Sequence, residues 1–414
     1  MTTPSTLDFN GLFKQAYADN LADLVPEQAV LVKAVPFKKA AAILGAQYNQ
    51  PVILRREQGF TYAGQNAGAF NLNPAISMQT QNAVVPGWQL VERSAIDYET
   101  FEKSDNKNSF RNAVDLVMEN AMESFNYRLE TGLLYGASPT GLGSWTVAPT
   151  SPTATTAVIT FTAAQWSVGI WAESEGAPLD VYTTGNALVN TIGPVTVSAV
   201  NVAGKSITVT GNATDITAVA ATAAGYVVFY GSYGNIAYGI DYILSTSGSV
   251  FGIDNTTYNL WKANVVTGVT KSLAGLLSTV AVAQGRGLNE DVDILVDPVS
   301  WNAILSDQAA LRLYDSSYSP AKLENGAKAI TFHSQNGMLT LRSHTYVKAG
   351  EFFVLPLDRL VRVGATDTTF NIPGTMDGKV FQQIPNQAGF EFRVYSNQAM
   401  LIETPAKCVK GFWA

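Results

Sequence analysis

One long segment without charge limits how this chain can fold. Residues 59–87, GFTYAGQNAGAFNLNPAISMQTQNAVVPG, contain no Asp, Glu, Lys or Arg. Strand-like runs lie on both sides of this segment, over residues 52–57 and 88–98. A structureless loop of this length is rare inside a compact domain, and an isolated hairpin is only marginally stable in water. The pattern therefore predicts a two-stranded projection whose tip is stabilised by other chains. An ordinary disordered loop is the alternative.

The composition indicates a folded protein and argues against a tight nucleic-acid binder. Apolar residues make up 47% of the 414 residues and charged residues only 14%, whereas charge-driven disorder requires many charges and few aromatic residues. The formal charge of −7, from 26 basic and 33 acidic residues, differs from the basic surface that holds phosphates. So low a charge content indicates a surface that other molecules largely cover. The length predicts two or three compact units.

Cysteine content and targeting signals narrow the cellular context. Cys408 is the single cysteine, so the chain forms no internal disulfide and no thiolate zinc cluster. The first residues, MTTPSTLDFNGLFKQAYADNL, lack the basic and apolar regions of a signal peptide. No stretch approaches the roughly 18 apolar residues that a membrane span requires. We therefore expect a protein that is made in the cytosol and does not contact a membrane.

The first 50 residues predict an arm rather than a domain. Leucine and aromatic residues recur at helical spacing over residues 12–24, and Pro26 and Pro36 prevent a longer helix. One short helix followed by extended chain buries little apolar surface on itself. Such an arm gains more by lying on a neighbouring molecule.

A long amphipathic helix is predicted over residues 108–135. Its apolar residues step by three or four and alternate with charged residues, and Gly136 provides an end signal. At about 1.5 Å per residue the helix spans roughly 40 Å, enough to cross a whole subunit. The apolar positions are Phe110, Val114, Val117, Ala121, Phe125, Leu129 and Leu133.

Beyond this helix the sequence changes to a β pattern. Between residues 137 and 261, six acidic residues accompany a single basic residue, Lys205, and contribute −5 of the net charge. Alternating apolar and hydroxyl residues on both sides of the turn at 203–205 predict a hairpin. The pattern predicts an all-β insertion over 145–236, a mixed α/β unit over 237–375 and closing strands over 376–414.

The motifs that could indicate catalysis are incomplete. The two histidines, His333 and His344, lack the neighbouring motifs of hydrolases and zinc proteases and are predicted to be structural. An S-D-N pattern at Ser104 and an S-x-x-K pattern at Ser319 match two motifs of penicillin-recognising serine enzymes. Their order is reversed, however, and the third motif of those enzymes, K-T-G, does not occur in the sequence.

The acidic residues at 290–297 could contact a cation, but they lack the spacing of a calcium-binding loop. Asp297, which precedes Pro298, is instead predicted to cap a helix. We therefore predict no enzyme activity, no catalytic residue, no cofactor and no metal site.

The order of these pieces resembles that of the major capsid proteins of tailed bacteriophages, which have the Hong Kong 97-type fold. Residues 238–244 (YGIDYIL) and 251–261 (FGIDNTTYNLW) are similar to a "G-L-D-x-I-L … F-x-G-I-D-R-x-T-Y-x-x-W" pattern in that family. Residues 293–301 (DILVDPVSW) resemble its strand-to-helix step, and the ending over 390–405 resembles its closing strands. Asn255 departs from the pattern, which has a basic residue at this position.

The resemblance implies an α+β fold with six parts. These are an N-terminal arm (1–50), an extended hairpin loop (51–103), a spine helix with part of a peripheral domain (104–144), an all-β insertion domain (145–236), an axial α/β domain (237–375) and closing strands of the peripheral domain (376–414).

The resemblance also implies a structural protein that self-assembles into hexamers and pentamers of an icosahedral phage head enclosing double-stranded DNA. The expected partners are other copies of the chain, a separate scaffold protein, a portal protein and an optional decoration protein. Contact with packaged DNA is expected to be weak and non-specific, because the net charge is negative. The protein would be assembled in the cytoplasm of a host bacterium and reside in the virion.

Two other functions remain open from the sequence. An encapsulin-type protein shell is the closer alternative, since it shares the fold. A secreted β-rich adhesin or carbohydrate-binding protein is an alternative from a different class.

Five residues are expected to contribute to contacts between subunits. Ion pairs at the base of the projection would fix its angle, although an exposed pair contributes little unless it is desolvated. The expected interface residues are Arg55, Arg56, Trp88, Glu92 and Arg93.

Overall fold

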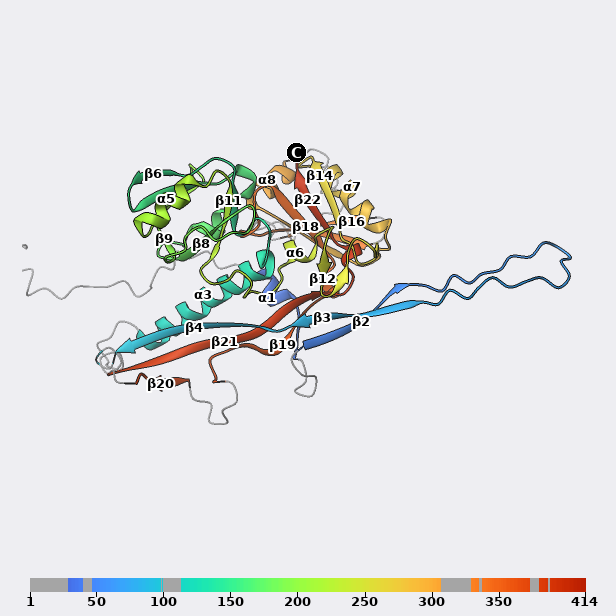
Figure 1. Cartoon of the computed structure of the whole chain (residues 1–414), viewed down its shortest axis with the longest axis horizontal. Helices are drawn as coiled ribbons and strands as arrows, with labels where there is room; N and C mark the ends of the chain where they lie inside the picture. The colour runs from blue at the N-terminus through green and yellow to red at the C-terminus, as the bar shows by residue number, and fades with distance from the viewer. Residues whose placement is uncertain are drawn as a thin grey trace, which may run out of the picture.

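A 23-residue helix, α3 (Ala113–Tyr135), runs through the middle of the fold (Figure 1). The computed structural model describes residues 29–39, 47–97, 99, 113–306, 329–334, 337–372, 380–385 and 388–414. The expected arm helix over residues 12–24 and the motifs at Ser104 and Ser319 lie outside these residues.

The described part of α3 confirms the long helix that the apolar spacing predicts, including its end before Gly136. A side-chain carbon on Gly136 would lie 2.1 Å from the carbonyl oxygen of Ala237. Only glycine permits this approach, so the chain that returns from the insertion can pass directly over the end of the helix.

α3 packs on a long five-stranded sheet. Its central strand, β21 (Gly389–Ile402), pairs antiparallel with β4 (Trp88–Asp97) along one edge and with β20 (Phe381–Gln383) and β19 (Leu360–Thr369) along the other. β1 (Phe37–Lys39) adds a parallel strand to β19. The strand near the end of the chain thereby lies beside the strand that precedes α3.

A six-stranded sheet with its own apolar core forms a second unit. Helix α7 (Leu273–Gln284) packs against β14 and β22, and α8 (Pro298–Leu305) packs against β17. Asp297 caps α8 by accepting the backbone N–H groups of Val299 and Ser300, which confirms the predicted cap. In sheet order the strands are β14 (Asn264–Val269), β22 (Val409–Trp413), β18 (Glu351–Leu355), β15 (Val292–Val296), β17 (Gly337–Ser343) and β16 (Ala329–Ser334).

Two strands, β19 and β22, each lie in a different sheet from the one predicted. β19 was expected in the axial α/β unit over 237–375, but it pairs with β21 in the long sheet. β22 was expected among the closing strands over 376–414, but it lies in the six-stranded sheet between β14 and β18. Alternating apolar residues indicate that a segment is a strand without indicating its partner. The chain crosses from one sheet to the other after β18 and returns after β21.

A seven-stranded sheet forms the insertion (Figure 1). A stack of aromatic side chains fills its base, where the rings of Phe161 and Trp171 lie 4.9 Å apart. In sheet order the strands are β5 (Gly143–Trp145), β11 (Gly225–Phe229), β8 (Pro178–Thr183), β9 (Val195–Asn201), β10 (Ser206–Thr210), β7 (Thr156–Thr160) and β6 (Thr150–Thr153).

The insertion is not purely β, which corrects the expectation for residues 145–236. Helix α5 (Ala213–Ala221) packs against β6 and β7, and the four-residue helix α4 (Val168–Trp171) lies at the base of the unit. Asn212 caps α5 by accepting the N–H of Thr214, while Ile216 and Val219 are buried. Threonine and valine in α5 favour strands by propensity, but the cap and the buried face outweigh that preference here.

The insertion is joined to the six-stranded unit by more than its two connecting segments. The N–H of Ala349 donates to the carbonyl of Trp166 at 3.0 Å, and the N–H of Gly350 donates to that of Ala164 at 2.9 Å. The Ser167 hydroxyl donates to the carbonyl of Thr345 at 2.8 Å. These bonds restrict rotation of the insertion relative to the sheet.

A buried carboxylate near the C-terminal end of α3 connects three parts of the chain. Glu130 is completely buried and accepts the backbone N–H groups of Leu31 and Val32, in helix α1 (Val30–Ala34), at 2.7 and 2.9 Å. His344 Nδ1 accepts the N–H of Tyr346 at 3.2 Å, so its Nε2 carries the proton and donates to Glu130 at 2.9 Å. His344 is therefore a hydrogen-bonded structural residue, as predicted.

Replacing Glu130 with alanine is expected to destabilise the chain by about 3 kcal/mol, because two buried N–H groups and His344 lose their acceptor. Glu119→Ala, at an exposed position on the same helix, is the matched control and is expected to change stability by less than about 0.5 kcal/mol. Urea unfolding of both variants measures the difference. Equal effects would contradict the assigned role of Glu130.

Candidate assembly surface

A hairpin projects far from the rest of the molecule (Figure 1). Strands β2 (Gln47–Arg55) and β3 (Gln79–Pro86) pair antiparallel at its base. Beyond them residues 56–78 continue as two extended tracks with few bonds between them, including Gln58 N–H to the Ile76 carbonyl at 3.0 Å. The projection that the uncharged segment predicts is therefore present.

The second strand of the hairpin differs from the expected one. The run over 88–98 was expected on the far side of the projection, yet the strand that pairs with β2 is β3, inside the uncharged segment. The run over 88–98 forms β4, which pairs with β21. The first half of β3 is Gln-Thr-Gln-Asn and is mostly exposed, so it lacks the alternating apolar pattern by which strands are recognised.

The projection exposes large apolar side chains to solvent. Tyr62 is 91% exposed and Leu72 is 78% exposed, which is far beyond what isolated surface residues require. Along each track these side chains alternate with polar or small residues, as in a strand with one apolar face. The exposed set consists of Phe60, Tyr62, Phe70, Leu72, Ile76 and Met78.

Hydrogen bonds from β3 set the position of the hairpin base. The N–H of Val84 donates to the Phe251 carbonyl at 2.9 Å, and the Gln81 amide donates to the Gly252 carbonyl at 3.0 Å. The Gln79 amide donates to the Tyr258 hydroxyl at 2.6 Å. These acceptors belong to the turn between β12 (Ser249–Val250) and β13 (Ile253–Asp254) and to the residues after it, within the FGIDNTTYNLW motif.

Asn255 has a structural role in the same motif. It is completely buried, and its amide nitrogen donates to the carbonyl of Ser245 at 3.1 Å. Asp254 beside it accepts from the hydroxyls of Thr256 and Thr257, and these bonds lower its pKa to about 2. The turn is thus held by local hydrogen bonds, and an amide occupies the position at which the resemblance suggests a basic residue.

The five expected interface residues do not lie together. Arg55 ends β2 and donates to the Ser77 carbonyl at 3.4 Å, and Arg56 follows it; both are exposed at the base of the projection. Trp88 begins β4 and is half-buried, whereas Glu92 and Arg93 lie farther along β4, which runs away from the projection (Figure 1). The expected position at the base is therefore wrong for Glu92 and Arg93.

Arg93 and Glu92 each face a charged residue of their own chain. Arg93 Nε donates to Glu391 on β21 at 2.7 Å, which joins the two neighbouring strands. Glu92 faces Arg128 of α3 across a groove; burial raises its pKa to about 7, although the positive charge of Arg128 acts in the opposite direction. Sequence reasoning did not identify Arg128 or Glu391, because neither partner follows from local spacing.

The groove between α3, β4 and the insertion has a volume of about 620 Å³. Glu92 and Arg128 are the charged residues in its lining, and the Arg128 guanidinium lies 3.4 Å from the centre of the Phe229 ring. Trp88 lines the end near the hairpin, and Leu90 is partly exposed beside it. This mostly apolar groove suits contact with another polypeptide better than catalysis.

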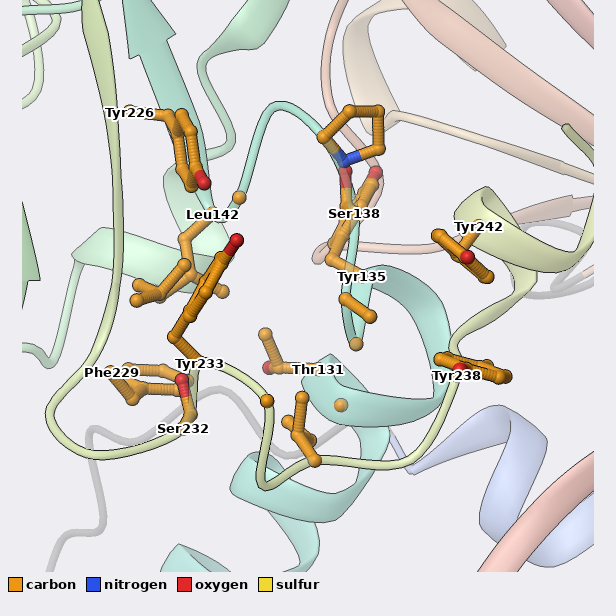
Figure 2. A pocket seen from close by; sticks show the side chains of 18 of the residues that line it. Thr131, Tyr135, Ser138, Leu142, Tyr226, Phe229, Ser232, Tyr233, Tyr238 and Tyr242 are labelled. Carbon is orange, nitrogen blue, oxygen red and sulfur yellow. The ribbon is translucent and has the colours of Figure 1, made fainter. Parts of the chain in front are cut away.

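A smaller pocket of about 330 Å³ lies at the end of α3. The rings of Tyr226 and Tyr233 lie on one side of it and those of Tyr238 and Tyr242 on the other, with Thr131 of α3 between them (Figure 2). Burial raises the pKa of Tyr226 to about 12, so its hydroxyl stays protonated at neutral pH. Because the lining contains no carboxylate, histidine, lysine or cysteine, it offers no general base for catalysis at neutral pH.

Within the described residues, no group of three or more His, Cys, Asp or Glu side chains could hold a metal ion. None of the helices in the described part of the chain is long and apolar enough to cross a membrane.

Comparison with known proteins shows the fold. No protein-family profile and no curated protein matches the sequence. The capsid chain of cyanophage A-1(L) has 11% identity and a TM-score of 0.54, over 97% of this chain and 100% of that chain. The capsid chain of the native GTA particle has 8% identity and a TM-score of 0.53, over 100% and 99% of the two chains. The capsid chain of the empty GTA particle has 7% identity and a TM-score of 0.54, over 100% of both chains.

The similarity extends over nearly the whole of each chain, so it describes the complete fold and not one shared domain. This chain therefore has the α+β, Hong Kong 97-type fold of those capsid chains, and the predicted fold class is confirmed. Identities of this size establish the fold alone.

Glu92→Gln is expected to stabilise the unassembled chain relative to wild type at pH 8 but not at pH 5. The pKa of Glu92 is about 7 in the folded chain and has its usual value of 4.5 in the unfolded one. Between these values the folded state binds more protons, so the wild type loses stability as the pH rises through this interval. Urea midpoints at both pH values measure the effect. Glu57→Gln, at an exposed position, is the control, and the same pH response in both variants would contradict the expectation.

Proposed function

We propose that this chain is the subunit of a virus-type protein shell and that its copies form the hexamers and pentamers of an icosahedral phage head around double-stranded DNA. The main support is the projection, whose exposed apolar side chains lie beyond the reach of the body of their own chain. Other copies of the same chain are the proposed partners that cover them.

The energetics of the projection favour assembly. Full burial of one large apolar side chain contributes about 1.5–3 kcal/mol, so the six exposed side chains of the tracks offer enough free energy to order the tracks against a neighbour. No charged residue in 59–87 opposes this burial through desolvation. A surface with few charges elsewhere is consistent with contacts on several sides.

The proposed role is structural and not enzymatic. The two pockets described above are apolar or aromatic, and His344 is committed to a buried hydrogen bond. A separate scaffold protein, a portal protein and a decoration protein are proposed as further partners, with weak contact to packaged DNA because the net charge is −7. The proposed location is the virion, after assembly in the cytoplasm of a host bacterium.

The five interface residues take different parts in this proposal. Arg55 and Arg56 are exposed at the base of the projection, where they would meet the neighbour on which it lies. Trp88 and Glu92 line the groove and would contact a segment of another subunit there. Arg93 would act indirectly, because its pair with Glu391 holds β4 against β21.

Electron microscopy of the purified, expressed chain tests the proposal. Closed shells built of hexamers and pentamers are expected when the scaffold partner is present. Regular shells of the correct size from this chain alone would contradict the need for a scaffold. An enzyme cargo inside the shell, without a portal vertex, would identify an encapsulin-type shell instead.

Leu72→Asp is expected to reduce shell formation at least tenfold, because it places a charge on the apolar face of the projection. Val147→Asp is the matched control, since Val147 is 75% exposed on the insertion and Leu72 is 78% exposed. Size-exclusion chromatography and negative-stain imaging measure assembly, and circular dichroism checks that both variants are folded. Normal assembly of the Leu72 variant would count against a role for the projection.

A further inference from the structure

The aromatic pocket at the end of α3 is a cavity that the proposed function does not use. Its lining comes from both the body and the insertion, because Thr131 belongs to α3, Tyr226 to β11 and Tyr242 to helix α6 (Ile240–Ile243). The two segments that connect the insertion to the body complete the lining. The volume of about 330 Å³ lies at the lower end of the range of about 300–1,000 Å³ that small-molecule sites occupy.

Two stacks of tyrosine rings form opposite walls of this pocket (Figure 2). In one stack, the ring of Tyr182 lies 4.3 Å from that of Tyr233 and 5.7 Å from that of Tyr226. In the other stack, the rings of Tyr238 and Tyr242 lie 4.5 Å apart with an angle of 25° between their planes. Stacking restricts the rotation of each ring, so the walls are already in position for a ligand.

Two hydroxyl groups of the lining have partners within the chain, whereas that of Thr131 has none. The Tyr226 hydroxyl donates to Asn186 Oδ1 at 2.7 Å, and the Ser138 hydroxyl donates to Asp241 Oδ2 at 2.6 Å. Thr131 is completely buried, and within the described residues its Oγ1 has no hydrogen-bond partner. It lies between the two aromatic walls (Figure 2). A buried hydroxyl without a partner is costly, so a ligand that bonds to it at the inner end of the pocket recovers that cost.

The lining carries no charged side chain, which limits the class of ligand. Asp241, next to Tyr242 in the sequence, does not line the pocket; it is paired with Lys410, which also lies 3.4 Å from Glu351 Oε2. A charged ligand would lose its hydration in the pocket without gaining a counter-charge. A sugar would leave most of its hydroxyl groups without partners, because the lining is mainly aromatic and aliphatic.

We propose that this pocket binds a small, neutral aromatic molecule that carries one hydroxyl or N–H group, of the phenol or indole class. Its ring lies between the two aromatic walls, and its polar group bonds to Thr131 Oγ1. Because one wall belongs to the insertion and the other to the body, the bound molecule contacts both units and holds them together. This binding is a property of the single chain and does not depend on the proposed function.

Saturation-transfer NMR of the purified, unassembled chain with phenol tests the proposal. We expect a dissociation constant below about 1 mM, which is within the limit for so small a ligand. Cyclohexanol keeps the hydroxyl but lacks the aromatic ring, tetramethylammonium is a cation and glucose is a sugar. Each of these three is expected to bind at least about tenfold more weakly than phenol. A lack of phenol binding would overturn the proposal, as would equal or tighter binding of any of the three.

A pair of tyrosine variants locates the site. Tyr238→Ala removes part of one wall and is expected to weaken phenol binding about tenfold. Tyr230→Ala is the matched control, because Tyr230 is 57% exposed and lies outside the lining, and it should bind phenol as the wild type does. Circular dichroism checks that both variants are folded. The same affinity in both variants would show that phenol binds elsewhere.

Thr131→Val tests the hydrogen bond while keeping the shape of the side chain. It is expected to weaken phenol binding about tenfold, but to leave the binding of toluene, which has no hydroxyl, unchanged. An equal effect on the two ligands, or no effect on either, would overturn the role of Thr131. Because toluene binding reports on the pocket itself, a variant that fails to fold is recognised by the loss of both ligands.

Discussion

The buried carboxylate of Glu130 is the interaction on which the arrangement of the chain most depends. It lies near the C-terminal end of α3 and joins the helix to α1 and to the loop at His344. A buried carboxylate is costly unless every oxygen is hydrogen-bonded, so its partners must all be in place for the helix to pack. The charged cluster at Asp241 and Lys410 provides a second junction beyond the end of α3, between α6 and the six-stranded sheet.

The projection differs from the body of the molecule in where its apolar side chains lie. The body buries its apolar residues in two cores, whereas the projection exposes Tyr62 and Leu72 to solvent. Its base is nevertheless well defined, because amide and backbone groups of β3 bond to the turn at Phe251. Hydrogen bonds within the chain therefore set the angle of the hairpin, and salt does not screen them. The apolar side chains toward the tip remain exposed for a partner to cover.

Part of this arrangement was predictable from local patterns. The helix ending at Tyr135, the cap at Asp297 and the existence of a projection follow from spacing, capping chemistry and the lack of charge over 59–87. The hairpin partner β3 was missed because its polar residues give no strand pattern, and α5 was missed because its residues also suit strands. The partners of Glu92 and Arg93 were not predictable, since Arg128 and Glu391 are distant in sequence.

The sequence by itself determined the long helix that ends at Tyr135, the cap at Asp297 and the existence of the projection, because those properties depend on residues a few positions apart. It also determined that little charge is available for the surface. Only the tertiary structure decided that β19 and β22 lie in sheets other than the expected ones, and that Lys410 meets Asp241. Strand pairing and buried charge pairs depend on contacts between residues far apart in the sequence, for which local periodicity carries no information.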